Sequence, residues 1–180
     1  MRIGVYSGKL TKLRTEVLAV PCFEDIRPLR GWAGEIDWLY GSVFSNLLMK
    51  GKINGKLGEM LLLATEQRMQ ISKVILVGLG RSAAYDCLDL GLVGRRIAET
   101  LVGLHAGELA VELQMPLPPS VEMPLLIDAF MKGMEEVEYP GPLDLTFVVA
   151  DVEKAKALER KIRNGLSIGN PSHSLAKDRA

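Results

Sequence analysis

The chain of 180 residues is long enough for one domain with a substantial buried core. Hydrophobic residues make up 48% of it, which excludes an intrinsically disordered class. Lys and Arg number 22 and Asp and Glu also number 22, so no net positive charge attracts nucleic acid or anionic lipid. We therefore expect neither a nucleic-acid partner nor a membrane partner.

The location of the protein is suggested by two further features. No apolar run reaches the roughly 18 residues that cross a bilayer, and the start Met-Arg-Ile-Gly-Val-Tyr lacks the apolar stretch of a signal peptide. The only cysteines, Cys22 and Cys87, are expected as reduced thiols. Together these features predict a soluble, cytoplasmic protein.

Six short apolar runs predict β-strands. Several have consecutive rather than alternating apolar residues, which is typical of strands covered by helices on both faces. The runs are residues 3–6, 17–21, 59–65, 74–79, 109–113 and 144–150.

Four segments with apolar residues at helical spacing lie between or after these strands. The resulting order β-β-α-β-β-α-β-α-β-α predicts an α/β fold in three layers, with a mixed, mostly parallel sheet of about six strands flanked by helices. Pro124 suits the first turn of its helix and Asp151 suits an N-cap. The helical segments are residues 35–49, 86–105 (starting near Asp86 or Asp89), 124–137 and 152–163.

Two segments show no such pattern. Residues 114–119 hold three prolines and predict a loop. Residues 164–180 contain Gly, Asn, Pro and Ser without an apolar stripe, and predict a flexible tail after a single domain of residues 1–163.

A Gly-x-Gly loop that follows the fourth predicted strand is the most distinctive motif. Ligands of α/β domains bind beyond the carboxyl ends of the strands, so Gly78, Gly80, Arg81 and Ser82 are candidate ligand-binding residues. The loop fits the dinucleotide fingerprint only formally, because the following helix does not open at the third position, Ala83. One interpretation is a tight structural turn; the other is a small pocket in which the loop amides, Arg81 and Ser82 donate hydrogen bonds.

A second glycine loop, Arg30-Gly31-Trp32-Ala33-Gly34-Glu35, precedes the first predicted helix. If both loops lie at the same sheet edge, Gly31 and Gly34 would line one cleft with the Gly78–Ser82 loop. Nearby arginines would favour an anion there, whereas nearby acidic residues would oppose it. The arginines are Arg27, Arg30 and Arg81, and the acidic residues are Glu24, Asp25 and Glu35.

The sequence supplies no convincing catalytic set of residues. The two histidines, His105 and His173, have no partner at metal-ligand spacing, and neither H-E-x-x-H nor paired C-x-x-C occurs. The nucleophile motif G-x-S-x-G occurs only as Gly165-Leu-Ser-Ile-Gly169, within the predicted tail rather than at a strand-to-helix turn. We therefore expect no catalytic residue, no metal site and no cofactor, and we interpret His105 as a helix-terminal residue.

Four segments, taken in order and spacing, resemble a known family. They are Glu16-Val-Leu-Ala-Val-Pro21, the Gly31–Gly34 loop leading into a helix, the pairs Gly51-Lys52, Gly55-Lys56 and Gly58-Glu59, and Lys73-Val-Ile-Leu-Val-Gly-Leu-Gly80. The chain resembles the N-terminal domain of the leucine aminopeptidase (cytosol aminopeptidase) family over about residues 1–163. The resemblance implies a macro-domain-like α/β fold.

The same resemblance frames the function. In that family the peptidase chemistry belongs to a separate C-terminal domain with two metal ions, whose N-T-D-A-E-G-R type segment does not occur here. The related macro domains bind ADP-ribose, and some hydrolyse it from proteins, but their asparagine-rich segment after the second strand is replaced by Pro21-Cys-Phe-Glu-Asp25.

Three hypotheses stay open. The first is a noncatalytic accessory module for assembly, binding its own kind, a full-length aminopeptidase or another protein. The second is a macro-like binder of a nucleotide or ADP-ribose type ligand. The third, less favoured, is residual aminopeptidase or ADP-ribosyl hydrolase activity.

Overall fold

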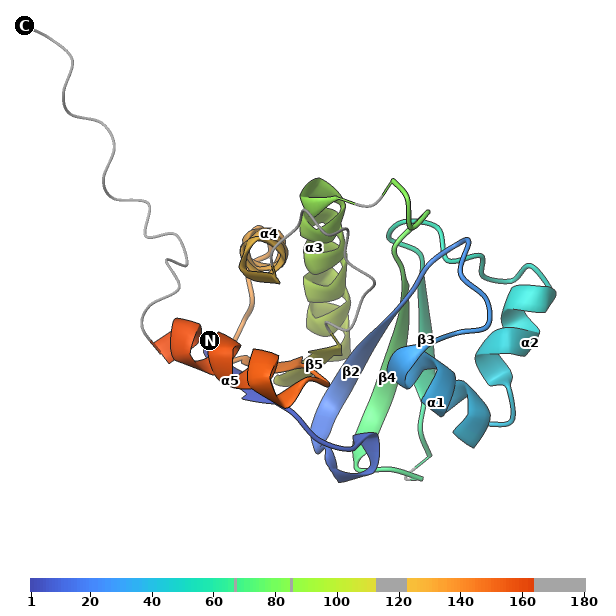
Figure 1. Ribbon diagram of the computed structural model, residues 1–180, viewed down its shortest axis with the longest axis horizontal. Helices are drawn as coiled ribbons and strands as arrows, with labels where there is room; N and C mark the ends of the chain where they lie inside the picture. The colour runs from blue at the N-terminus through green and yellow to red at the C-terminus, as the bar shows by residue number, and fades with distance from the viewer. Residues whose placement is uncertain (67, 85, 113–122, 164–180) are drawn as a thin grey trace, which may run out of the picture.

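The computed structural model describes residues 1–66, 68–84, 86–112 and 123–163 as a sheet between two layers of helices (Figure 1). The six-stranded sheet has the order β1-β6-β5-β2-β4-β3. All neighbouring strands are parallel except β3, which runs antiparallel to β4 at one edge. The strands are β1 (Arg2–Tyr6), β2 (Thr15–Cys22), β3 (Met60–Ala64), β4 (Ile71–Gly78), β5 (Glu108–Glu112) and β6 (Asp144–Val148).

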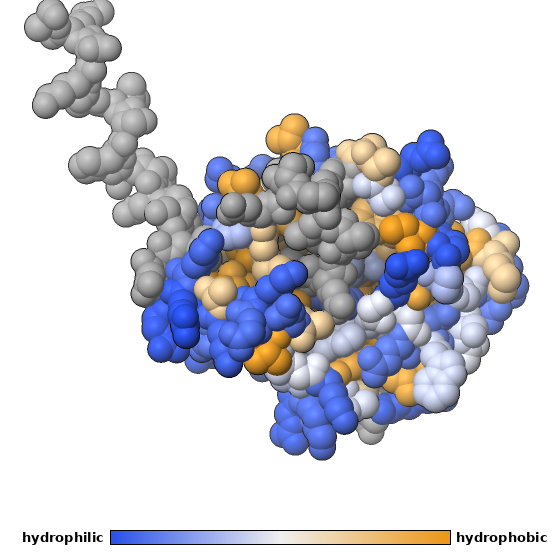
Figure 2. All heavy atoms as spheres, in the orientation of Figure 1, coloured by the Kyte–Doolittle hydropathy of each residue, from blue (hydrophilic) through white to orange (hydrophobic). Residues whose placement is uncertain are grey.

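The helices divide between the two faces of the sheet. The helices α1 (Gly31–Leu39) and α2 (Val43–Met49) and the short 3-10 turn η1 (Leu10–Lys12) cover one face. The helices α3 (Cys87–Leu104), α4 (Met123–Glu135) and α5 (Val152–Arg163) cover the other. The outer surface of α5 is hydrophilic, as Figure 2 shows, in keeping with its many Lys, Arg and Glu residues.

The central strands β2 and β4 contribute to both hydrophobic cores because successive side chains of a strand point to opposite faces. Val17 and Ala19 of β2 pack under α3 and α4, whereas Leu18 and Val20 pack under α1. This arrangement explains the consecutive apolar residues in the sequence, and it confirms the predicted three-layer α/β fold with a mostly parallel sheet.

One predicted helix, residues 35–49, is wrong as a single element. The structure has two helices there, separated by Gly41 and Ser42, which adopt φ values of +66° and +62°. The carboxylate of Asp37 accepts hydrogen bonds from the backbone N–H (3.0 Å) and hydroxyl (2.5 Å) of Ser45, in the first turn of α2. The apolar stripe continues through the break, so spacing alone did not reveal it.

Several local predictions are confirmed. Asp86 is the N-cap of α3, His105 ends that helix, and the boundaries of α5 match the prediction. Asp151 accepts hydrogen bonds from the backbone N–H groups of Glu153 and Lys154. The predicted loop at 114–119 and tail at 164–180 lie outside the described residues. Within the described part of the chain, no helix is both long and apolar enough to span a bilayer.

Candidate functional site

The Gly78–Ser82 loop continues β4 at the carboxyl edge of the sheet. A Cβ atom on Gly78 would lie 2.1 Å from the carbonyl oxygen of Lys56, so only glycine fits there. Gly80 has a φ of +74°, donates its N–H to the carbonyl of Gly55 (2.9 Å) and accepts the N–H of Glu24 (2.8 Å). The close approach at Gly78 and the hydrogen bonds of Gly80 therefore hold this loop against its neighbours. This agrees with the interpretation of the motif as a tight structural turn.

The next two residues of this loop differ in their surroundings. The backbone N–H and hydroxyl of Ser82 both donate 2.9 Å hydrogen bonds to the carboxylate of Asp25. These bonds, the backbone one foremost, hold the pKa of Asp25 below its usual range, with a smaller contribution from the nearby Arg81. Arg81 is exposed to solvent. A ligand at Ser82 would have to compete with Asp25 for both donors.

The second glycine loop meets a buried carboxylate. Glu112, the last residue of β5, is 2% exposed, and its Oε1 accepts the backbone N–H of Trp32 at 2.9 Å. Gly31 has a φ of +60°, and a Cβ atom there would lie 2.5 Å from the same oxygen. Glycine at position 31 thus lets the carboxylate approach the first turn of α1.

The ionisation of Glu112 reflects this environment. Burial raises the pKa of Glu112 to about 7, the Trp32 N–H opposes that rise, and the nearby Glu35 carboxylate adds to it. No other hydrogen bond joins Glu112 to the described residues. A carboxyl group with a pKa near neutrality changes its ionisation state within the physiological pH range.

Gly34 has a packing role. A Cβ atom on Gly34 would lie 2.6 Å from the carbonyl oxygen of Leu29, which only glycine avoids. Among the described residues, no hydrogen bond or ion pair joins the Gly31–Gly34 loop to the Gly78–Ser82 loop. A small cavity of about 20 Å³ between the sheet and α3 is lined by Leu79 and Glu112, among others, but by no residue of the Gly31–Gly34 loop.

Carboxylates also accept hydrogen bonds from other clusters of backbone N–H groups. Oε2 of Glu59 accepts the N–H groups of Asn54, Gly55 and Lys56 at 2.8, 2.9 and 3.2 Å. Asp86 accepts two N–H groups in the first turn of α3, at 2.7 and 3.0 Å. Amides in loops and at helix N-termini are the usual binding groups for phosphate, so here the protein's own acids fill such positions.

The thiol of Cys22 lies at the same edge, at the end of β2. It is buried, and burial raises its pKa to about 12. A thiol with so high a pKa is a weak nucleophile at neutral pH. In the described part of the chain, no group of three or more His, Cys, Asp or Glu residues is placed to hold a metal ion.

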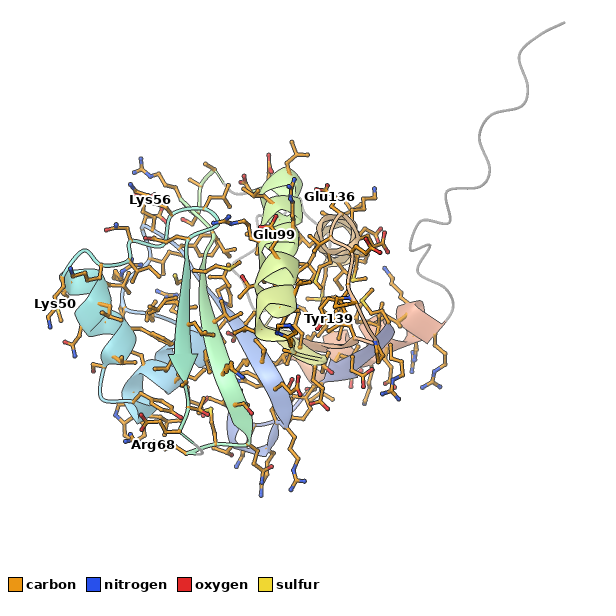
Figure 3. The ribbon with its side chains drawn as sticks, turned by 180° about the vertical axis from the view of Figure 1, so that it is seen from behind. Lys50, Lys56, Arg68, Glu99, Glu136 and Tyr139 are labelled. Carbon is orange, nitrogen blue, oxygen red and sulfur yellow. The ribbon has the colours of Figure 1, made fainter. Side chains whose placement is uncertain are left out.

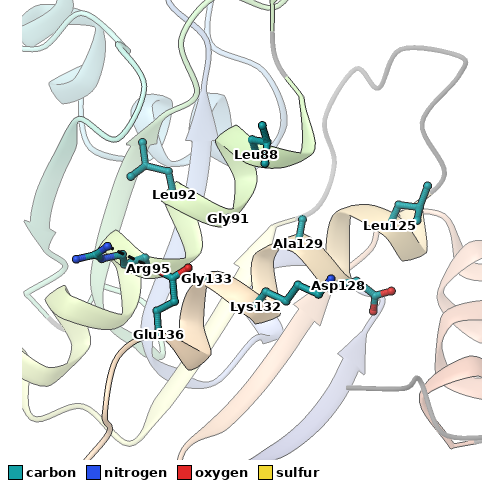
Figure 4. Close-up of a pocket in the computed structure, with 10 residues that line it drawn as sticks. All are labelled: Leu88, Gly91, Leu92, Arg95, Leu125, Asp128, Ala129, Lys132, Gly133 and Glu136. Carbon is teal, nitrogen blue, oxygen red and sulfur yellow. Dashed lines mark hydrogen bonds and ion pairs between the residues drawn. The ribbon is translucent and has the colours of Figure 1, made fainter. Parts of the chain in front are cut away.

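A much larger depression lies on the outer surface of α3 and α4. It is a groove of about 610 Å³ with small residues of both helices along it (Figure 4). Three leucines border it with large exposed fractions, namely Leu88 (82%) and Leu92 (43%) from α3 and Leu125 (55%) from α4. Exposed apolar side chains gathered beside a groove are typical of interaction surfaces.

Sequence reasoning missed both the groove and Glu112. Glu112 gave a signal, since it is a charged residue within an otherwise apolar predicted strand. The groove gave none, because Leu88, Leu92 and Leu125 follow no motif and come from two helices with β5 between them in the sequence.

The topology and the glycine loops define a macro-domain-like α/β fold. A tomato leucine aminopeptidase mutant superposes with a TM-score of 0.67 at 17% identity, covering 91% of this chain and 35% of that chain. A Trypanosoma brucei macrodomain in complex with ADP superposes with a TM-score of 0.66 at 18% identity, covering 89% of this chain and 69% of that chain. At these identities the likeness shows the fold alone.

The family follows from the sequence comparison. Residues 19–123 match the model of the cytosol aminopeptidase family, N-terminal domain, and the chain belongs to that family. A probable cytosol aminopeptidase of Colwellia psychrerythraea is 38% identical over 86 residues, which is 48% of this chain. The alignment spans only 17% of that relative's length.

Proposed function

We propose that the chain is a noncatalytic accessory module of the cytosol aminopeptidase family that acts in the cytoplasm through protein contacts. The observation that carries this proposal is the groove along α3 and α4 with its exposed leucines Leu88, Leu92 and Leu125. Burying three leucines on association supplies a favourable free energy of several kcal/mol, at about 1.5–3 kcal/mol for each fully buried side chain.

The noncatalytic part of the proposal is supported by the region of the family that is matched. The matching model describes the N-terminal domain, and the aligned segment covers 17% of the Colwellia aminopeptidase. We therefore expect no hydrolysis of leucyl substrates by the purified chain, with or without added manganese or zinc.

A nucleotide-like ligand held by Gly31, Gly34, Gly78, Gly80, Arg81 and Ser82 is the alternative. Its support is the likeness of the fold to macrodomains, of which the Trypanosoma brucei protein was solved in complex with ADP. The acids on the amides of Trp32 and Ser82 weigh against it, because a phosphate would have to displace a carboxylate at each position.

Size-exclusion chromatography with light scattering tests the proposal. The wild-type chain is run alone and mixed with a full-length cytosol aminopeptidase of the same organism. We expect a defined complex in at least one run, lost in the L88S/L92S variant. Met49→Ser is the matched control, since Met49 is 77% exposed on α2, across the sheet from the groove.

A thermal-shift titration with ADP-ribose and mononucleotides tests the alternative. Ligand binding to the folded state alone stabilises it by about 2.7 kcal/mol at a hundredfold excess over Kd. Arg81→Ala is the better variant here, because Gly80 has a positive φ and a larger residue would strain the backbone. The proposed function would be overturned by two results together. One is a rise in melting temperature with a nucleotide that is lost in R81A, and the other is a chain that stays monomeric and forms no complex with the aminopeptidase.

A further inference from the structure

The floor of the α3–α4 groove is made by an unusually close approach of the two helices. A Cβ atom on Gly133 of α4 would lie 1.8 Å from the carbonyl oxygen of Gly91 on α3. Ala129 and these glycines leave a shallow floor without long side chains. Leu88 and Leu92 lie on the α3 side of the groove and Leu125 on the α4 side (Figure 4). The apolar surface is thus open to another molecule.

The charges around the groove fall into two groups. Arg95 is already paired, with Glu136 across the groove at 3.4 Å and with Glu99 on its own helix at 3.1 Å. Asp128 and Lys132 have neither an ion pair nor a hydrogen bond with any described side chain. They lie four residues apart on the exposed side of α4, a separation of about 6 Å along the helix axis.

We propose that the α3–α4 groove binds a second copy of this chain across a two-fold axis that passes α4 midway between Asp128 and Lys132. This inference rests on the proposed use of the groove for protein contacts and names the partner. In such a dimer the two α4 helices run antiparallel, so Asp128 lies opposite Lys132 of the partner subunit, and the reverse pair forms by symmetry.

Self-complementarity is what favours a second copy as the occupant. A two-fold interface presents the same patch on both sides, so charged residues within it attract only where opposite signs face each other across the axis. The free pair Asp128 and Lys132 meets this condition, and the three bordering leucines supply apolar surface around it. The chain as a whole has 22 basic and 22 acidic residues, so net charge does not oppose association with itself.

Charge exchange at these two positions provides the test. Sedimentation velocity over a wide range of concentrations should show a dimer for the wild type. Asp128→Lys places two lysines opposite two lysines, and Lys132→Asp places two aspartates opposite two aspartates. Each variant alone should dimerise about a hundredfold more weakly, because like charges then face each other at a desolvated contact.

Two rescue experiments separate charge pairing from damage to the helix. Mixing the D128K and K132D proteins restores opposite charges across the interface, so a heterodimer should form with close to the wild-type affinity. The double variant D128K/K132D should dimerise with itself again for the same reason. Lys50→Asp, just after the C-terminal end of α2 and away from Glu99 and Glu136 in Figure 3, is the control and should leave the dimer unchanged.

The outcomes distinguish this inference from the proposed function. Failure of the mixture and of the double variant to recover the dimer, with both single variants folded, would overturn the two-fold pairing. A monomeric wild type that still binds a full-length aminopeptidase through Leu88 and Leu92 would also overturn it, yet would leave the proposed function standing. A monomer with no partner would overturn both.

Discussion

The carboxylate of Glu112 and the backbone N–H of Trp32, 80 residues apart in the sequence, form a 2.9 Å hydrogen bond at the carboxyl edge of the sheet. The bond joins the end of β5 to the first turn of α1. It places a negative group at the positive end of a helix, which is favourable, but in a buried position, which is costly for an ionised acid.

The burial of Glu112 predicts a stability that falls as pH rises. Its pKa in the folded protein, about 7, lies above the ordinary value of 4.5. The protonated form is therefore favoured by folding, and this contribution is complete below about pH 4.5 and lost as pH rises through about 7. The loss is about 3 kcal/mol in the free energy of unfolding.

The Glu112→Gln variant measures that contribution. Gln cannot ionise and can still accept a hydrogen bond from the Trp32 N–H. The stability of the variant relative to the wild type should therefore increase as pH rises from 5 to 8. Urea unfolding at several pH values gives the difference. Glu108→Gln, at the exposed start of β5, is the control. A wild-type-minus-E112Q difference that stays flat with pH would contradict the prediction.

The contact between Gly133 and Gly91 predicts a strong effect of a single methyl group. Gly133→Ala places a Cβ atom 1.8 Å from a backbone carbonyl, and α3 and α4 must separate to accommodate it. We expect a loss of about 3 kcal/mol in the free energy of unfolding, measured by thermal or urea denaturation.

Gly103→Ala is the matched control for Gly133. Gly103 also lies in a helix, α3, but a Cβ atom there has nothing within 4 Å. The alanine should stabilise the protein by about 0.5–1 kcal/mol, because it removes the entropic cost of a helical glycine. Equal effects of the two substitutions would show that the helices are not in close contact.

The three amides held by Glu59 predict that this acid stabilises the 54–56 loop. Glu59→Ala removes the acceptor for all three N–H groups, which should cost about 1–3 kcal/mol. Glu66→Ala, an exposed acid beyond the other end of β3, should change stability by less than about 0.5 kcal/mol. Hydrogen exchange of the Asn54–Lys56 amides should accelerate in E59A alone.

The burial of Cys22 predicts a slow thiol reaction. In a Cys87→Ser background Cys22 is the only thiol of the chain. With a pKa of about 12, its thiolate fraction at pH 8 is about a thousandfold below that of an ordinary thiol. Labelling with a disulfide reagent should be correspondingly slow in the folded protein and fast in urea. Rapid labelling without denaturant would contradict the buried placement.

Features that depend on residues close together in the sequence were predictable, whereas features that depend on long-range contacts were not. All six strands and the start of α3 at Asp86 were predictable, because apolar periodicity and side-chain caps are local signals. The break between α1 and α2 was missed since the stripe of Ile36, Val43 and Leu47 keeps helical spacing across it. Gly41 and Ser42 carried the only local signal of the break.

The candidate site depended on contacts that sequence spacing does not contain. The glycines at 31, 34, 78 and 80 were predictable as conformationally special, but not the carbonyls and carboxylates that require them. Trp32 meets Glu112 only because α1 begins beyond β2, the strand beside β5. Whether the six predicted residues bind a ligand stays a prediction.

The position of β1 has a consequence for synthesis on the ribosome. Among the described strands its only neighbour is β6, with Arg2 aligned to Asp144 and Tyr6 to Val148. Until residue 148 has emerged, the first strand has no hydrogen-bonding partner, although β2, β4 and β5 already have theirs. A newly made chain therefore carries β1 as an unpaired strand from its synthesis until residue 148 has emerged, and an unpaired strand is the kind of segment that chaperones protect from aggregation.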